Sequence, residues 1–209
     1  MSPLNQNPGK LLSALLVLCL LVPACKKDAD PDPTPTSEIE YYFYGSVDGA
    51  DVVFELKPLG DIEVGNGLSA NNNPPDECDV DYSGFIGAYD GYPFFEVEFV
   101  NYYIGPCGET NEDFHSLFPP GMYPYFIESP VEGFGVQVKY AGVDEVVYRS
   151  SLGDQTGSDF ELTASFEADN LFGKYQRIKG KLNCMLYAEN GDSIELKDAS
   201  FSLSLVSFF

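Results

Sequence analysis

From Tyr41 to the C-terminus, short runs of β-branched and aromatic residues alternate with turn residues about every eight to twelve positions. Asp48-Gly49 and Asn190-Gly191 are dipeptides that favour tight hairpin turns, and each lies between two such runs. No stretch of the sequence keeps the apolar period of a long amphipathic helix. The pattern predicts an all-β fold, an antiparallel β-sandwich of the immunoglobulin-like or jelly-roll type.

The expected strands cover most of the chain after its first forty residues. Four hairpins are expected, joining residues 41–47 to 51–57, 80–89 to 94–104, 132–140 to 145–151, and 177–189 to 192–198, with two further strands at 159–167 and 199–209. In the last strand Phe201, Leu203 and Leu205 alternate with serines, which predicts one buried face. One short helix is expected in a long loop, at residues 112–118.

The N-terminus carries an apolar run, residues 11–22, interrupted only by Ser13. A helix that spans a bilayer needs roughly 20 apolar residues, so this run is too short and is typical of a signal-peptide core. The sequence Val22-Pro23-Ala24-Cys25 that follows resembles the lipobox of bacterial lipoproteins. The resemblance implies a signal peptide at residues 1–24 and acylation of Cys25. An ordinary secretory signal with a chance cysteine is the alternative.

Residues 25–40 are rich in Pro and Asp and contain little that a core would bury. They predict a disordered tether, which at ~3.1 Å per residue in polyproline II holds the following domain up to ~40 Å from its anchor. The rest of the chain, 41–209, has the length of one domain. Lys26 follows the predicted lipid site, where an Asp would imply retention at the inner membrane. We therefore expect attachment to the outer membrane, with its cell-surface or periplasmic face left open.

The composition is strongly acidic, with 33 Asp and Glu against 11 Lys and Arg and a formal net charge of −22 at pH 7. No Lys or Arg occurs between Lys57 and Lys139. Such a field repels polyanions, so nucleic acid and anionic lipid surfaces are not expected as partners, whereas cations are favoured. Solubility alone is the alternative explanation of the charge.

Three cysteines remain after the signal peptide and the predicted lipid site are set aside. Cys78 and Cys107 bracket the hairpin 80–104, and an oxidising envelope permits a disulfide between them. With Tyr89 opposite Phe94 across the turn, Cys78 lies opposite Gly105, close to Cys107, which favours this pairing. The third, Cys184, lies in an apolar strand pattern and is predicted to be a buried free thiol.

Three segments carry a resemblance to a known group of proteins: YYFYGSVDGADVVFE at 41–55, PPGMYPYF at 119–126, and RIKGKLNCMLYAENGDSIELKDASFSL at 177–203. Together with the lipobox and the tether, they resemble the all-β envelope lipoproteins of unknown function that are abundant in Bacteroidota. The resemblance implies a β-sandwich on the cell envelope, and it brings no catalytic residues.

An acidic segment before the second hairpin suggests calcium. In DVDYSGFIGAYD the residues Asp79, Asp81, Ser83, Gly84, Ile86 and Asp90 match a calcium-loop template, but no helix enters the loop and the segment has strand character. A looser site at the edge of a loop fits better, with ligands from Asp76, Glu77, Asp79 and Asp81. The alternative is a solvated acidic loop beside a disulfide.

Enzyme motifs are sparse. His115 is the one histidine, and on the expected helix it lies among phenylalanines, so neither a catalytic triad nor a zinc site is expected. Glu96 and Glu98 lie on one face of a strand, a spacing that sandwich-fold glycosidases use for two carboxylates. The same pattern is typical of an ordinary strand with Phe95 and Val97 facing inward.

A long aromatic segment, residues 101–126, suggests a binding site. Sugar rings stack on aromatic faces while polar side chains bind their hydroxyl groups, and loops on a rigid sandwich often carry such sites. The candidate binding residues are Asn101, Tyr102, Tyr103, Tyr123 and Tyr125. The alternative is that these aromatics close one end of the core.

These observations predict a lipid-anchored, non-enzymatic binding module that recognises a glycan or an envelope protein, with calcium as a candidate cofactor. The alternatives left open are a structural or assembly role through an exposed sheet edge, and a glycoside or ester hydrolase.

Overall fold

The computed structural model describes residues 40–58, 60–73, 77–104, 114–127, 133–170 and 173–206. All of them belong to one compact unit, Ile39–Phe209. The predicted signal peptide, Cys25 and all but the last residue of the predicted tether lie outside the described residues. Within the described part, no helix is long and apolar enough to cross a membrane.

The described residues form strands joined by turns and two short 3-10 helices. The strands are β1 (Tyr42–Val47), β2 (Ala50–Glu55), β3 (Ile62–Asn73), β4 (Glu77–Ala88), β5 (Phe94–Ile104), β6 (Gly121–Met122), β7 (Gly133–Ala141), β8 (Val147–Arg149), β9 (Asp159–Asn170), β10 (Gly173–Tyr187) and β11 (Ser193–Leu205). The 3-10 helices are η1 (Phe114–Ser116) and η2 (Ser150–Leu152). The predicted all-β, antiparallel fold is confirmed.

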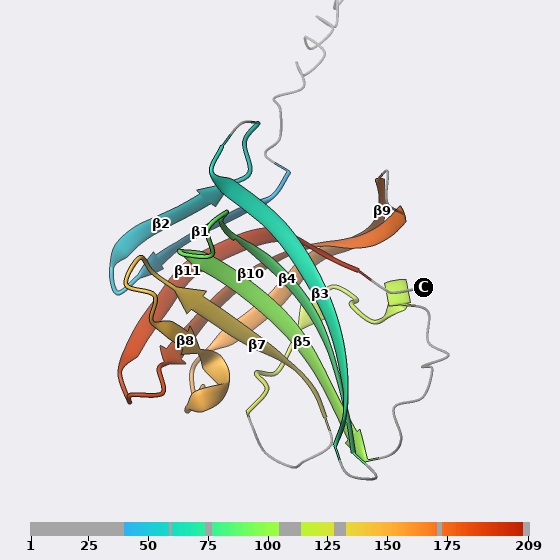
Figure 1. The fold of residues 1–209 in the computed structure, drawn as a ribbon. Coiled ribbons are helices and arrows are strands. Elements are labelled where there is room, and N and C mark those ends of the chain that lie inside the picture. Colours follow the sequence, from blue (N-terminus) through green and yellow to red (C-terminus); the bar gives the residue numbers. More distant parts are fainter. Residues whose placement is uncertain are drawn as a thin grey trace, which may run out of the picture. The chain divides into compact units, whose positions relative to one another are not determined.

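The strands form one sheet in the order β2-β1-β11-β10-β8-β7-β5-β4-β3, with β9 also paired to β10 and β6 paired to β9. The sheet curls into a nearly closed sandwich: in Figure 1, β3, β4, β5 and β7 cross in front of β1, β11, β10 and β9. The short strand β8 joins the two layers, because it pairs with β7 and also with β10 through Arg149 and Tyr187.

Aromatic side chains fill the space between the layers. Phe43 of β1 stacks on Phe95 of β5, with ring centroids 4.0 Å apart. Phe201 of β11 lies 5.8 Å from Phe95 and 5.7 Å from Phe160 of β9, and all four side chains are fully buried. This column binds one layer to the other, because stacked and tilted ring pairs add to the gain from apolar burial.

Most predicted hairpins form, but the register of the second one differs from the prediction. The N–H of Ala88 donates a hydrogen bond to the carbonyl of Pro93. Phe94 lies opposite Gly87, whereas the prediction placed it opposite Tyr89. Proline has no N–H, so Pro93 takes part in the ladder as an acceptor, and the four-residue turn lies one residue earlier than expected, at 89–92 instead of 90–93. Cys78 therefore lies opposite Tyr103.

Three further expectations differ from the structure. The strand β3 was not predicted. The expected strands at 192–198 and 199–209 are one continuous strand, β11, and its serines are not on an open face: Ser202 and Ser204 are buried. The expected helix at 112–118 is reduced, within its described residues, to the single 3-10 turn η1, which packs Phe114 and Phe118 against the core.

Candidate functional site

A groove of about 420 Å³ crosses the outward face of β3, β4 and β5. The register places side chains of these strands and of β7 in rows across this face. One row runs from Gly65 through Phe85 and Glu96 to Lys139, and the next runs from Gly67 through Ser83 and Glu98 to Gln137. Glu63 and Phe94 add to the lining at one end.

The floor of the groove exists because β3 has glycines where side chains would otherwise project. A Cβ atom on Gly65 would lie 2.2 Å from Cε1 of Phe85, so the Phe85 ring lies directly against the glycine backbone. A Cβ atom on Gly67 would lie 2.9 Å from Oγ of Ser83, so this glycine also leaves room in the groove. Gly67 thus leaves a depression in the sheet face, whereas the space over Gly65 is occupied by the Phe85 ring, which forms one wall of the groove.

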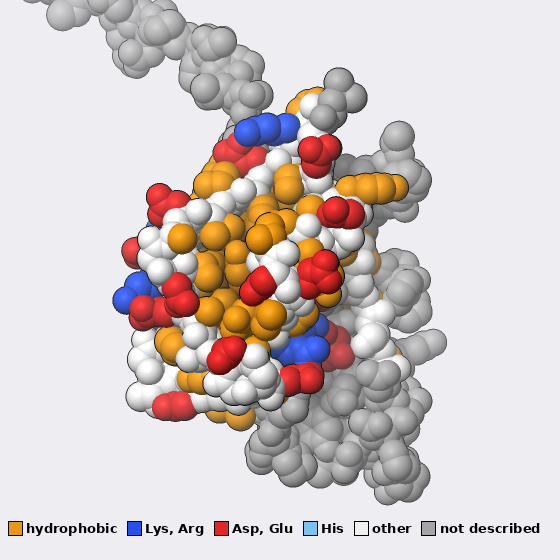
Figure 2. All heavy atoms as spheres, turned by 60° about the vertical axis from the view of Figure 1, so that its left-hand side comes forward, with side chains coloured by type: hydrophobic (Ala, Val, Ile, Leu, Met, Phe, Trp, Pro, Cys, Tyr) orange, Lys and Arg blue, Asp and Glu red, His pale blue; other side chains and the backbone are white. Residues whose placement is uncertain are grey.

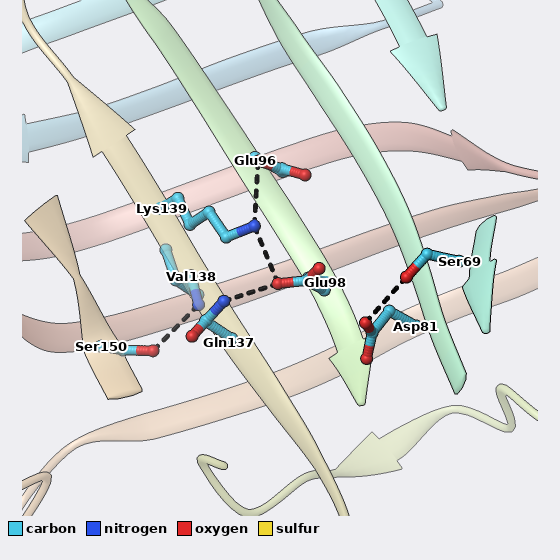
Figure 3. Close-up of polar contacts among 8 residues, drawn as sticks. All are labelled: Ser69, Asp81, Glu96, Glu98, Gln137, Val138, Lys139 and Ser150. Atoms are coloured by element: carbon cyan, nitrogen blue, oxygen red, sulfur yellow. Dashed lines mark hydrogen bonds and ion pairs between the residues drawn. The ribbon is translucent and has the colours of Figure 1, made fainter. Parts of the chain in front are cut away.

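One amine holds the two carboxylates of β5. Nζ of Lys139 lies 2.9 Å from Oε2 of Glu98 and 3.5 Å from Oε2 of Glu96. Gln137 donates a hydrogen bond of 2.5 Å to the same Glu98 oxygen, and Figure 3 shows these side chains converging from β5 and β7. The three charged side chains are each only 15–20% exposed, so their positions are fixed by partners and by packing.

Two carboxylates share one amine, so the cluster carries more negative than positive charge. Burial raises the pKa of Glu96 above its ordinary value, with Lys139 opposing the shift and Glu98 adding to it. Burial acts to lower the pKa of Lys139, but the two carboxylates outweigh it and raise that pKa. Both shifts follow from placing two carboxylates and one amine in a half-buried position.

Two tyrosines of the predicted aromatic site have described side chains, and both contact the core. Tyr123 packs its ring against Phe99 and Phe160, and its hydroxyl donates to the carbonyl of Pro119 at 2.7 Å. The hydroxyl of Tyr125 bonds to the carbonyls of β9 and β10, and burial raises its pKa. Both rings therefore help to close the core.

The other members of that predicted site are on β5. Asn101 is half-buried and lies opposite Val80 of β4 and Phe134 of β7. Tyr102 and Tyr103 belong to the same strand, and their side chains lie outside the described residues, as does His115. The structure does not bring Tyr123 or Tyr125 into the groove described above.

The predicted calcium ligands are only partly described. Asp81 lies on β4, where its carboxylate accepts a hydrogen bond of 3.0 Å from Ser69. Asp76, and the side chains of Glu77 and Asp79, lie outside the described residues. Among the side chains that the structure describes, no group of three or more His, Cys, Asp or Glu is arranged to hold a metal ion.

The cysteines separate into two environments. Cys78 is disulfide-bonded, and Cys107, its predicted partner, lies outside the described residues, so the pairing stays a prediction. Cys184 is confirmed as a buried free thiol. Burial raises its pKa to about 12, and it lies beside the hydroxyl of Tyr125.

The sequence indicated Glu96 and Glu98 but not the residues that make their surroundings. Lys139, Phe85 and the β3 glycines were missed, because only the pairing of four strands brings them together. In the sequence, the only hint of the groove was the run of Gly and small polar residues in β3. That run lacks the apolar alternation of a strand, so it did not predict that β3 lies beside β4. Comparison of the chain with protein-family models, with curated proteins and with solved structures gives no match.

Proposed function

We propose that this chain is an envelope lipoprotein whose β-sandwich binds a carbohydrate in the groove on β3, β4 and β5. The observation that carries the proposal is the Phe85 ring lying on Gly65 beside the ordered carboxylate of Glu96. Sugars present apolar C–H faces that suit an aromatic ring and hydroxyl groups that donate to carboxylates. A few ordered polar groups in a largely apolar hollow are typical of small-molecule sites.

The groove is suited to recognition because its polar groups are held before any ligand arrives. Lys139 and Ser83 orient Glu96 of the lining, and Lys139 and Gln137 hold the neighbouring Glu98, so ligand binding orders few side chains. Glu63 adds a further acceptor and Phe94 a further ring at the same end of the groove. Calcium assistance from the acidic segment at 76–81 stays part of the proposal.

The N-terminal sequence supports the place of action. In this proposal Cys25 carries the lipid that anchors the chain to the outer membrane, and the Pro- and Asp-rich tether holds the groove clear of the lipid surface. An anchored binding domain would concentrate a glycan at the envelope.

The test is a glycan-array screen of the mature protein, performed with calcium and again with EDTA. Phe85→Ala should weaken a glycan hit about tenfold or more, since loss of a stacked ring and its apolar contact removes about 1.4 kcal/mol or more. Gly67→Ala should also weaken it, because the added methyl fills the groove and turns Ser83 away from Glu96 without disturbing the backbone. Phe166→Ala is the matched control, an exposed phenylalanine on β9.

Two results would count against the proposal: no glycan captured in either buffer, or equal capture by wild type and Phe85→Ala. A hit lost only in EDTA would assign calcium a part in binding.

A second candidate is a glycoside hydrolase using Glu96 and Glu98. It is favoured by the position of Glu96, which is mostly buried beside a second carboxylate on the same face of β5; burial raises the pKa of Glu96, as a general acid requires. Release of sugar from the bound glycan, lost in Glu96→Gln with binding retained, would establish this alternative.

A further inference from the structure

The strand β2 ends the strand order of the sheet, and in the described part of the chain nothing pairs with its outer edge. Natural sheet edges are commonly guarded by proline, by lysine or by a β-bulge. The β2 sequence is ADVVFE, and its pairing with β1 runs from Ala50 to Glu55 without a register shift. The strand itself therefore has none of those three guards. Its own charges, Asp51 and Glu55, are acidic, and Glu55 is paired with Lys57 just beyond the strand.

The register shows which backbone groups face outward along this edge. Val47 and Ala50 flank the two-residue turn Asp48-Gly49, whose positive φ angles of 47° and 80° fit a type I′ hairpin. From this turn onward, every second residue of β2 exchanges backbone hydrogen bonds with β1. The hydrogen bond from the N–H of Leu56 to the carbonyl of Tyr41 fits this alternation, so the even-numbered residues face β1. The N–H and C=O groups of Asp51, Val53 and Glu55 consequently point away from β1.

Beside this edge lies an apolar groove of about 610 Å³. Its lining comes from Val52 and Phe54 of β2, from Pro93, and from Tyr140, Val143 and Tyr148 of the β7–β8 hairpin. Val53 and Val143 are 57% and 86% exposed. Figure 2, which brings the left-hand side of Figure 1 forward, shows hydrophobic side chains gathered in one area with Asp and Glu around it. An exposed apolar area of this kind marks an interaction surface.

The charge at this groove is of one sign. Asp51 and Asp144 belong to the lining, and among the described residues that line the groove none is lysine or arginine. Asp48 and Asp192 lie near Tyr148, where, after burial and Asp144, they add to the rise in its pKa. Carboxylates from three different hairpin turns and from β2 thus surround an apolar centre.

We propose that the β2 edge and this groove bind an extended, basic and amphipathic peptide segment of a protein partner, added to the sheet as a further strand. Backbone groups of the peptide would bond to those of Asp51 and Val53, as in other cases of strand addition. Side chains opposite Val52 and Phe54 would enter the groove and should be apolar. The side chain opposite Asp51 would lie on the outer face and should be basic.

A second copy of this chain is a poorer occupant of the same edge. Antiparallel pairing of two β2 strands about Val53 places Asp51 of each against Glu55 of the other, and like charges directly opposite are unfavourable. Lysines at those positions in a partner convert this repulsion into attraction. Because Lys57 already pairs with Glu55, Asp51 is the charge that chiefly selects a basic strand and discourages self-association.

The test uses the mature protein and a fluorescent peptide with the central sequence Lys-Val-Thr-Val-Lys, whose symmetry allows either strand direction. Fluorescence polarisation should show saturable binding, and the counterpart Glu-Val-Thr-Val-Glu should bind about tenfold more weakly or not at all. Equal binding of the two peptides, or no binding of either, would overturn the proposal. Sedimentation that shows the protein dimerising through this edge would replace the partner with a second copy.

Two variants separate strand addition from simple charge attraction. Val53→Pro removes one outward N–H, which an edge strand tolerates, and should weaken the lysine peptide about tenfold, whereas Val53→Thr keeps the N–H and should bind normally. Asp51→Lys should weaken the lysine peptide and strengthen the glutamate peptide. Unchanged binding in Val53→Pro and Asp51→Lys together would refute the assignment. Phe85→Ala should leave peptide binding intact, since it lies in the other groove.

Discussion

At the level of single residues, Lys139 is the side chain that makes the candidate site coherent. It pairs with both Glu96 and Glu98, which face outward from β5 because the strand alternates. Removing the amine would leave two half-buried carboxylates without a positive partner. This destabilises a fold more than replacing all the charged groups with apolar side chains of similar size. The arrangement holds two acceptors in place at the cost of a surplus negative charge.

That surplus leads to a pH-dependent prediction for Glu96. Its pKa in the folded state is raised above the ordinary 4.5, chiefly by burial. The folded state therefore holds the Glu96 proton more tightly than the unfolded state does. The resulting contribution to the free energy of unfolding is complete below about pH 4.5 and is lost as the pH rises through the raised pKa. Relative to Glu96→Gln, the wild type should lose free energy of unfolding between pH 4 and pH 8, as followed by urea denaturation at several pH values. A difference that stays constant, or grows in the opposite direction, would contradict the assigned shift.

The sequence could identify only part of this site. A period of two places Glu96 and Glu98 on one face and Phe95 and Val97 on the other, and the structure confirms both placements. The period within one strand does not say which strand lies beside it, so it could not supply Lys139. It is the pairing of β5 with β7, distant in the chain, that brings the amine to the carboxylates.

At the level of elements, Gly84 marks a close approach of β4 to β11. A Cβ atom there would lie 2.6 Å from the backbone oxygen of Ser204 and 3.2 Å from the Cβ of Leu203. The backbone oxygen cannot turn aside, so we expect Gly84→Ala to destabilise the fold by about 1–3 kcal/mol, as overpacking typically does. The midpoint of urea unfolding measures the change.

Gly67→Ala is the matched control for that prediction. Gly67 is also in a strand, but its added Cβ would meet only the hydroxyl of Ser83, which can rotate away from the half-buried Glu96 without moving the backbone. We expect a change of about half a kcal/mol or less in either direction. Equal effects of the two substitutions would show that the loss comes from strand glycines in general and not from the contact between layers.

Local chemistry predicts some elements of this fold well and others poorly. Asp48-Gly49 sets the first hairpin because its two residues adopt positive φ, a conformation that aspartate and glycine tolerate. The strand β3 was missed because IEVGNGLSANNN has few residues of high β-propensity. It is a strand because β4 pairs with it along its whole length. The serines of β11 were expected outside, yet Arg177, Glu40 and Asn66 cover them.

At the level of the whole molecule, both proposed binding surfaces are fixed by how the sheet curls. The carbohydrate groove lies on the outward face of one layer, and the peptide groove lies along the edge of β2, at the end of the other layer. They share no described lining residue. The two linings come next to each other at Pro93 and Phe94, so the independent tests are substitutions on separate strands, Phe85 on β4 and Val53 on β2.

The last prediction concerns the chain as a cell would hold it. If Cys25 is acylated, its fatty chains fix the protein to the membrane, because two chains suffice for stable anchoring and one alone is marginal. We expect the wild type in the membrane fraction of cells grown with a labelled fatty acid, and labelled. Cys25→Ser should move it to the soluble fraction without label, and Cys19→Ser should change neither. Label retained in Cys25→Ser would place the lipid elsewhere. An unlabelled, soluble wild type would mean that the N-terminus is an ordinary secretory signal.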